Sequence, residues 1–167
     1  CKDRLTFSVR EKIVAAIPFN LSILIGAYGL SLTSWGLTAF YLTFAYIGVL
    51  VMMRYTICPR CPHLLKGNDC LNMPAPWVKT LIAENRRGPL NTREKSLHRV
   101  VKYGILFIPI YWLVPHLHLL VPFVAFYLIG QATFRFHFCR RCKNEVCIQN
   151  RSTGCIHEWH VSAISMS

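Results

Sequence analysis

Two long stretches of this chain contain no charged residue. No Asp, Glu, Lys or Arg occurs from Ile13 to Met53 or from Tyr103 to Phe134. A helix needs about 20 apolar residues to cross the hydrocarbon core of a bilayer. The first stretch is long enough for two crossings joined by a tight turn, and the second fits two if flanking cations such as Lys102 and Arg135 extend toward water. A soluble helical core would show polar faces at helical spacing, and these stretches show none.

We therefore expect an all-α integral membrane protein with four transmembrane helices arranged as two hairpins. In the first hairpin, a helix over roughly 13–33 is followed by one over roughly 36–57. The segment Ser34-Trp35-Gly36 forms the turn, where Trp35 suits a membrane–water interface.

The second hairpin is shorter and is preceded by a proline-rich segment. Prolines between 58 and 96 exclude a long helix there. Asn91 or Thr92 is a plausible cap for the third helix, Pro115 interrupts near its far end, and the fourth helix continues to Phe138.

These features divide the chain into segments of distinct character. The two hairpins, each followed by a cysteine loop, are separated and flanked by polar stretches. The expected segments are an interfacial N-terminal segment (1–12), the first hairpin with its cysteine loop (13–70), a cytoplasmic linker (71–96), the second hairpin with its cysteine loop (97–147) and a polar tail (148–167).

Basic residues predict the orientation. All 19 Lys and Arg lie in the first twelve residues, between 54 and 102, or from 135 onward. Because cytoplasmic loops carry the excess of Lys and Arg, we expect both termini and the long loop in the cytoplasm, in a multi-pass protein of the inner (cytoplasmic) membrane. The net charge of +12 then favours anionic lipid head groups or other subunits of a membrane complex as partners. No nucleic-acid-binding motif accompanies the charge, so nucleic acid is not an expected partner.

The hairpins end in similar motifs. "RYTICPRC" (54–61) and "RFHFCRRC" (135–142) each place an Arg and an aromatic residue before Cys-x-x-Cys. A third cysteine follows each pair, Cys70 in the first copy and Cys147 in the second. The chain thus has the pattern of an internal repeat, whose units we expect to be related by a pseudo-twofold axis along the membrane normal.

The cysteine pairs indicate a metal centre. Two Cys-x-x-Cys pairs supply four sulfurs, the number that tetrahedral zinc or an iron–sulfur cluster requires. We expect helices two and four to end at the same membrane face, so that their sulfurs meet there. Six candidate thiolates and a surface that a quinone can reach favour iron–sulfur, whereas zinc is the commoner use of this spacing. The candidate metal ligands are Cys58, Cys61, Cys139 and Cys142, with Cys70 and Cys147 as additional or alternative ligands.

Disulfides are the competing interpretation of the eight cysteines. The basic bias places the cysteines in the reducing cytoplasm, which argues against disulfides unless the orientation is inverted. A thiol–disulfide membrane protein that uses Cys-x-x-Cys chemistry is a weaker alternative.

The histidines add less specific signals. His98 and His137 lie at the inner ends of helices three and four, where a bis-histidine haem is conceivable but less expected than plain interfacial histidines. His116 and His118 are expected to splay apart at the outer turn. Further possible ligands are His63 beside the first Cys pair, and Cys155, His157 and His160 in the tail.

Several function classes lack their residues. The sequence shows no nucleophilic triad, glycine-rich phosphate loop or paired carboxylates. Proton and ion translocation normally need ionisable side chains within the membrane, and apart from histidines the charge-free stretches provide none of these. We therefore expect a non-catalytic subunit of a membrane redox complex, which relays electrons or acts as an anchor through an iron–sulfur centre. The alternative is a zinc-stabilised scaffold or assembly subunit.

Overall fold

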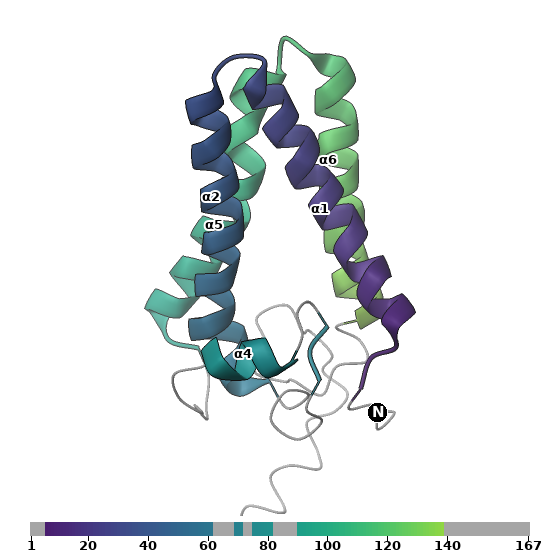
Figure 1. Cartoon of the computed structure of the whole chain (residues 1–167), viewed down its shortest axis with the longest axis vertical. Helices are drawn as coiled ribbons and strands as arrows, with labels where there is room; N and C mark the ends of the chain where they lie inside the picture. Colours follow the sequence, from purple (N-terminus) through teal and green to yellow (C-terminus); the bar gives the residue numbers. More distant parts are fainter. Residues whose placement is uncertain (1–5, 62–68, 72–74, 82–89, 139–167) are drawn as a thin grey trace, which may run out of the picture.

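Four long helices form the body of the protein. The computed structural model describes residues 6–61, 69–71, 75–81 and 90–138, and within these ranges the chain is helical, with no strand. The expected all-α class is therefore confirmed for this part of the chain. The long helices are α1 (Val9–Ser31), α2 (Trp35–Met52), α5 (Thr92–Leu113) and α6 (Leu117–Ala132) (Figure 1).

The helices form two antiparallel hairpins. The short turns after α1 and α5 lie together at one end of the bundle, which we call the turn end (Figure 1). The other end carries Cys58 and is called the cysteine end. Helix α1 packs mainly against α6, and α2 packs against α5. These two pairs are close near the turn end and diverge toward the cysteine end (Figure 1).

Both hairpins begin with the same capping arrangement. Ser8 Oγ accepts a hydrogen bond from the backbone N–H of Glu11, and the Glu11 carboxylate accepts one from the N–H of Ser8 (2.8 Å). Asn91 and Glu94 form the same box at the start of α5. The predicted cap at Asn91 is confirmed, whereas α1 begins at Val9 rather than at 13 because its capping box lies within the charged segment.

The hairpins also end alike, in π-helical turns. Helix α2 continues into η1 (Met53–Ile57), and α6 continues into η3 (Thr133–Phe138). With these turns included, the predicted end of helix two at 57 is correct, and helix four extends at least to Phe138, the last described residue. Each turn leads directly to the first cysteine of a Cys-x-x-Cys pair.

A short helix in the linker was not expected. Helix α4 (Ala75–Leu81) begins with Pro76 in its first turn, where a proline removes no helical hydrogen bond. Val78 is buried and Trp77 is exposed, so α4 covers the cysteine end with one face (Figure 1).

Small residues bring α1 close to its neighbours. Ser22, Gly26 and Gly29 are buried on one side of α1. A Cβ added at Gly26 would lie 3.0 Å from both the Phe123 ring and the Tyr41 hydroxyl. Close approach through small residues is typical of helix packing in membranes, where dispersion rather than water exclusion holds helices together.

A proline in α5 leaves one backbone carbonyl in need of a donor from another helix. Pro109 has no N–H, so the carbonyl of Ile105 lacks its normal helical donor. The buried hydroxyl of Tyr41 donates to this carbonyl at 3.1 Å. Because a backbone carbonyl inside a bilayer must find its donor within the protein, Tyr41 joins α2 to α5 by replacing the missing donor.

In the part of the chain that the structure describes, three helices have the length and apolar composition to cross a membrane. They are Val9–Ser31, Trp35–Ile57 and Leu117–Phe138. Most of their surface is exposed rather than packed inside the bundle, and it includes large apolar side chains such as Phe40 and Val121. These features indicate a membrane protein. Helix α5 is not among the three because its first half carries five charged residues.

Replacing Gly26 by Leu should destabilise the bundle by about 1–3 kcal/mol, because the buried Phe123 and Tyr41 leave no room for a side chain. Gly36→Leu is the matched control, since the nearest atom to its Cβ, Ser34 Oγ, is 3.6 Å away. Thermal unfolding in detergent measures the stability of both variants. Equal unfolding temperatures would contradict close packing at Gly26.

Tyr41→Phe should cost about 1 kcal/mol in stability, since it leaves the Ile105 carbonyl without a donor. In a Pro109→Ala background the helix supplies its own N–H, so the same substitution should cost much less. Tyr127→Phe is the control, because the Lys102 carbonyl that accepts its hydroxyl also has a regular helical donor available. A double-mutant cycle of Tyr41→Phe and Pro109→Ala, measured as free energies of unfolding, gives the coupling between the two residues. If the effects of the two substitutions simply add, Tyr41 does not replace the donor that Pro109 lacks.

Candidate metal centre

The first Cys-x-x-Cys pair lies on a tight turn at the end of α2. After η1, residues Cys58–Arg60 form a 3₁₀ turn (η2) with Pro59 near its start. The N–H of Cys61 donates to the carbonyl of Cys58 at 3.1 Å, which closes the turn. This turn brings the chain back on itself between the two cysteines, as a metal-binding knuckle requires.

Cys70 returns to the same place from the following loop. Cys58 and Cys70 are buried together with Met53 and Val78, and Cys61 packs at the edge of the cluster. All three cysteines are thiols. The hydrogen bond between the thiols of Cys58 and Cys70, and then burial, raise the pKa of Cys58 well above its usual range. Both effects favour the protonated thiol of Cys58 over its thiolate.

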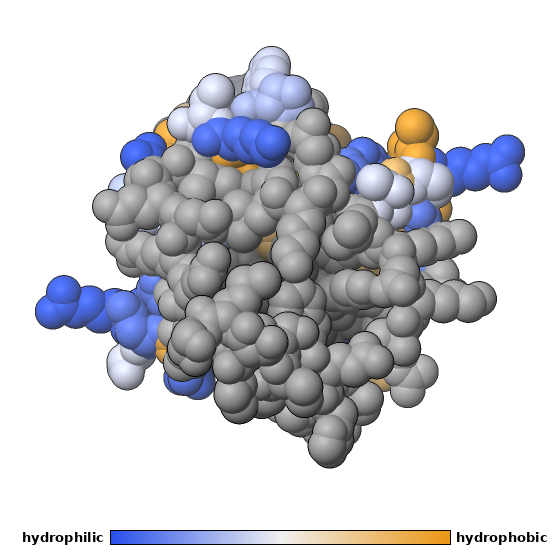
Figure 2. Space-filling model, turned by 90° about the horizontal axis from the view of Figure 1, so that it is seen from below, coloured by the Kyte–Doolittle hydropathy of each residue, from blue (hydrophilic) through white to orange (hydrophobic). Residues whose placement is uncertain are grey.

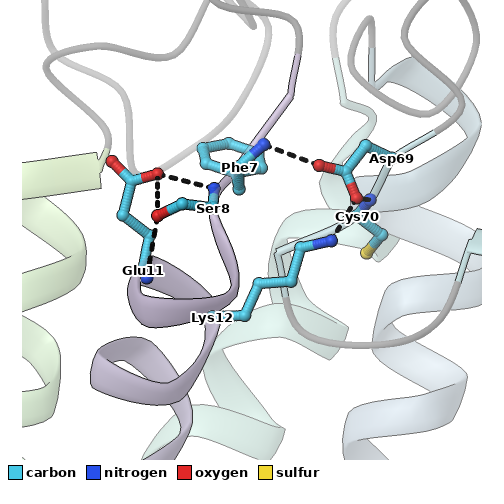
Figure 3. A network of polar contacts seen from close by, with 6 residues as sticks. All are labelled: Phe7, Ser8, Glu11, Lys12, Asp69 and Cys70. Atoms are coloured by element: carbon cyan, nitrogen blue, oxygen red, sulfur yellow. Dashed lines mark hydrogen bonds and ion pairs between the residues drawn. The ribbon is translucent and has the colours of Figure 1, made fainter.

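Asp69 connects this cluster to the start of α1 (Figure 3). Its carboxylate accepts hydrogen bonds from the N–H of Phe7 (2.6 Å) and from the N–H of Cys70 (2.9 Å). It also forms an ion pair with Lys12. We call this group of Phe7, Lys12 and Asp69 the N-terminal clasp. The clasp fixes the backbone of Cys70 relative to α1.

Electrostatics stabilise the charged form of Asp69. Burial alone would raise the pKa of its carboxyl, but the hydrogen bonds from Lys12, Phe7 and Cys70 and the charge of Lys12 together lower it. The clasp is therefore complete above the ordinary Asp pKa of 3.8 and is lost only as pH falls through a lower value.

Phe7 also contacts the second hairpin. Its ring lies edge-on to the ring of Phe138, with centroids 6.3 Å apart. Phe138 is the last residue before Cys139, and Asp69 immediately precedes Cys70. One residue thus contacts the neighbours of a cysteine from each hairpin.

The predicted ligand set is only partly within the described residues. Cys58, Cys61 and Cys70 are brought to one cluster, but within the described ranges no group of three or more His, Cys, Asp or Glu side chains is arranged to hold a metal ion. The remaining candidates lie outside the described residues. They are Cys139, Cys142, Cys147, His63, Cys155, His157 and His160.

The other histidines are placed differently from one another. His98 is 4% exposed, and its Nδ1 has no hydrogen-bond partner among the described groups, whereas His137 is exposed and packs its ring on Phe138. The expectation that His116 and His118 splay apart is wrong. Their rings lie 5.9 Å apart, because His118 belongs to the first turn of α6 and turns back toward the residue that precedes the helix.

The sequence reasoning missed the clasp residues. Lys12 and Asp69 are 57 positions apart, and a single ion pair at that separation leaves no periodic signal. The usable signal is the repeated Arg-Glu-Lys, which occurs at 10–12 and again at 93–95 behind equivalent caps. It marks the start of each hairpin and would have drawn attention to Lys12.

The chain matches no protein-family model, no curated protein and no solved structure. Its function must therefore be inferred from the residues themselves.

Asp69→Ala should speed the hydrogen–deuterium exchange of the Phe7 and Cys70 amides at pH 5–7 by about tenfold or more, since both N–H groups lose their acceptor. In the wild type this protection should persist down to pH 3.8, because the pKa of Asp69 is lowered. Glu11→Ala is the control and should expose the Ser8 amide while leaving that of Cys70 protected. Unchanged exchange at Cys70 in Asp69→Ala would show that the clasp does not hold it.

Proposed function

We propose that this chain is a small multi-pass membrane subunit whose two hairpins hold one thiolate metal centre at the cytoplasmic membrane face. In this proposal the centre is an iron–sulfur cluster that relays electrons within a membrane redox complex. The main support is Phe7, which contacts the residue before Cys139 and hydrogen-bonds the residue before Cys70. This pair of contacts supports the proposal that cysteines of both hairpins share one centre.

A fourth crossing, by α5, is part of the proposal. Helix α2 ends at the cysteine end and α6 begins at the turn end, and both have the composition of spans. We propose that the chain returns across the membrane between them through α5, which runs from one end to the other beside α2. Arg99 and Lys102 on α5 then extend toward the head groups.

The two hairpins resemble each other both where they begin and where they end, which supports a pseudo-repeat. Each begins with a capping box followed by Arg-Glu-Lys, and each ends in a π-helical turn before Cys-x-x-Cys. The packing of α1 on α6 and of α2 on α5 is the pairing that a twofold axis along the membrane normal would generate.

The cytoplasmic orientation rests on the basic residues. Hydrophilic side chains project around the rim of the cysteine end (Figure 2). Exposed basic residues there include Arg10, Arg54, Arg93 and Arg135, while the turns at the opposite end contain no Lys or Arg. In the cytoplasm the cysteines are kept reduced and available for a metal.

The donor set suits a thiolate-bound metal. Three described cysteines are one short of the four sulfurs of a tetrahedral site, and Cys139 directly follows the residue that Phe7 contacts. A bound cation would favour the thiolate form of Cys58, which its surroundings otherwise disfavour. An iron–sulfur cluster bound here would supply one-electron chemistry, and Met53 and Val78, which pack against Cys58 and Cys70, would shield it from water. At this depth a quinone in the bilayer is a possible electron partner.

One observation favours a second function, a zinc-stabilised scaffold or assembly subunit. The cysteine cluster already joins three separate elements, because it packs the end of α2 against α4 and reaches α1 through Asp69. A structural zinc ion would hold these elements together without any redox role.

Purified protein should contain one metal centre per chain, and Cys58→Ser and Cys139→Ser should lower its metal content by similar factors, since both ligate it. Cys1→Ser is the control, because Cys1 is not among the candidate metal ligands, and its variant should keep the metal. Elemental analysis with visible spectroscopy makes the measurement. Absorbance bleached by dithionite supports iron–sulfur, and colourless protein with stoichiometric zinc supports the scaffold. Loss of metal in only one of the two Ser variants would refute a shared centre.

A further inference from the structure

Two histidines meet in the turn between α5 and α6, at the turn end of the bundle (Figure 1). His116 is the last residue before α6, and His118 lies in the first turn of that helix. The centroids of their rings are 5.9 Å apart, and the ring planes cross at 82°. Two imidazoles that share one tetrahedral zinc ion have centroids about 5 Å apart, given Zn–N bonds of about 2.0–2.1 Å. A small rotation of the two side chains is therefore enough for both rings to bind one ion.

The backbone of this turn is fixed by hydrogen bonds on both sides of His116. Its N–H donates to the carbonyl of Leu113 at 2.9 Å. Its carbonyl accepts from the N–H groups of Leu119 at 2.8 Å and Leu120 at 3.0 Å. Pro115 also restricts the chain immediately before His116. The two rings are thus held near each other before any ligand binds, which lowers the ordering cost of binding.

Both rings have nitrogens available for a ligand. In the described part of the chain neither imidazole forms a hydrogen bond, and His116 occupies the N-cap position without capping α6. His118 is exposed and His116 is half-buried, so an ion from solution can reach them. The turn after α1 and the turn after α5 contain no Asp, Glu, Lys or Arg. No basic residue of these turns therefore repels a cation, and imidazole is their only strong metal ligand.

We propose that His116 and His118 bind one divalent transition metal ion at the turn end. Imidazole nitrogen suits zinc, copper and nickel, whereas magnesium and calcium prefer oxygen ligands. The described residues contain no group of three or more metal-binding side chains, so water completes the coordination and the ion can exchange. Because the N-terminal end of α6 carries partial positive charge and disfavours a cation, both imidazoles are needed to hold the ion. This site is independent of the thiolate centre proposed at the cysteine end.

Histidine footprinting of the full chain in detergent tests the proposal, with zinc chloride as the probe. Diethyl pyrocarbonate modifies free imidazole nitrogens, and peptide mass spectrometry measures the modification of His116 and His118 separately. Zinc should protect both rings with one common midpoint concentration, and magnesium should protect neither. His118→Ala should raise the zinc concentration that protects His116 by about tenfold or more, since changes even beyond the direct ligands cost metal sites this much. His116→Ala should have the same effect on the protection of His118.

Leu117→Ala is the matched control, because this exposed residue lies between the two histidines and should leave zinc protection as in the wild type. The proposal is overturned if zinc protects neither ring, if magnesium protects as well as zinc, or if one ring stays protected at the wild-type midpoint when the other is Ala. Should the Ala variants fail to fold, the wild type decides, since different zinc midpoints for the two rings exclude a shared ion. The measurement reads these two rings alone, so zinc bound at the cysteine end does not affect the outcome.

Discussion

The carboxylate of Asp69 is the contact on which the arrangement of the cysteine end depends. It binds the start of α1 through Phe7 and Lys12, and it binds the backbone of Cys70. These polar contacts join the cysteine loop to the first helix. Because Phe7 also contacts Phe138, the position of Asp69 influences both hairpins. The metal centre that we propose uses this end of the bundle, where the long helix pairs diverge.

The helical bundle itself is held by two complementary kinds of contact. Small residues on α1 allow close approach, and hydroxyl groups satisfy backbone carbonyls across helix pairs. Ser22 donates to the carbonyl of Phe123 on α6, and Tyr41 replaces the donor that Pro109 lacks on α5. The Tyr41 contact meets the requirement that backbone groups inside a bilayer find partners within the protein, and the Ser22 contact gives the buried hydroxyl of Ser22 a partner. They connect one hairpin to the other rather than the helices within a hairpin.

Much of the helical layout is predictable from the sequence because long charge-free stretches and local caps determine it. The cap at Asn91, the turn near Pro115 and the end of helix two follow from neighbouring residues. The pairing of helices between the two hairpins cannot be predicted in this way, since apolar helices of similar composition can pack in several orders. The same limit applies to the site. Cys-x-x-Cys spacing identifies Cys58 and Cys61, but the approach of Asp69 to Lys12 depends on how the loop folds back.

The central claim is that cysteines of the two hairpins meet at one place. Oxidative cross-linking tests it most directly, in a variant that keeps only Cys61 and Cys142, reconstituted in lipid and treated with copper phenanthroline. The account predicts an intramolecular disulfide, seen by mass spectrometry as a peptide pair containing Cys61 and Cys142, at high yield and at any protein concentration. Two thiols that remain alkylatable, or disulfides that form only between separate chains, would contradict it.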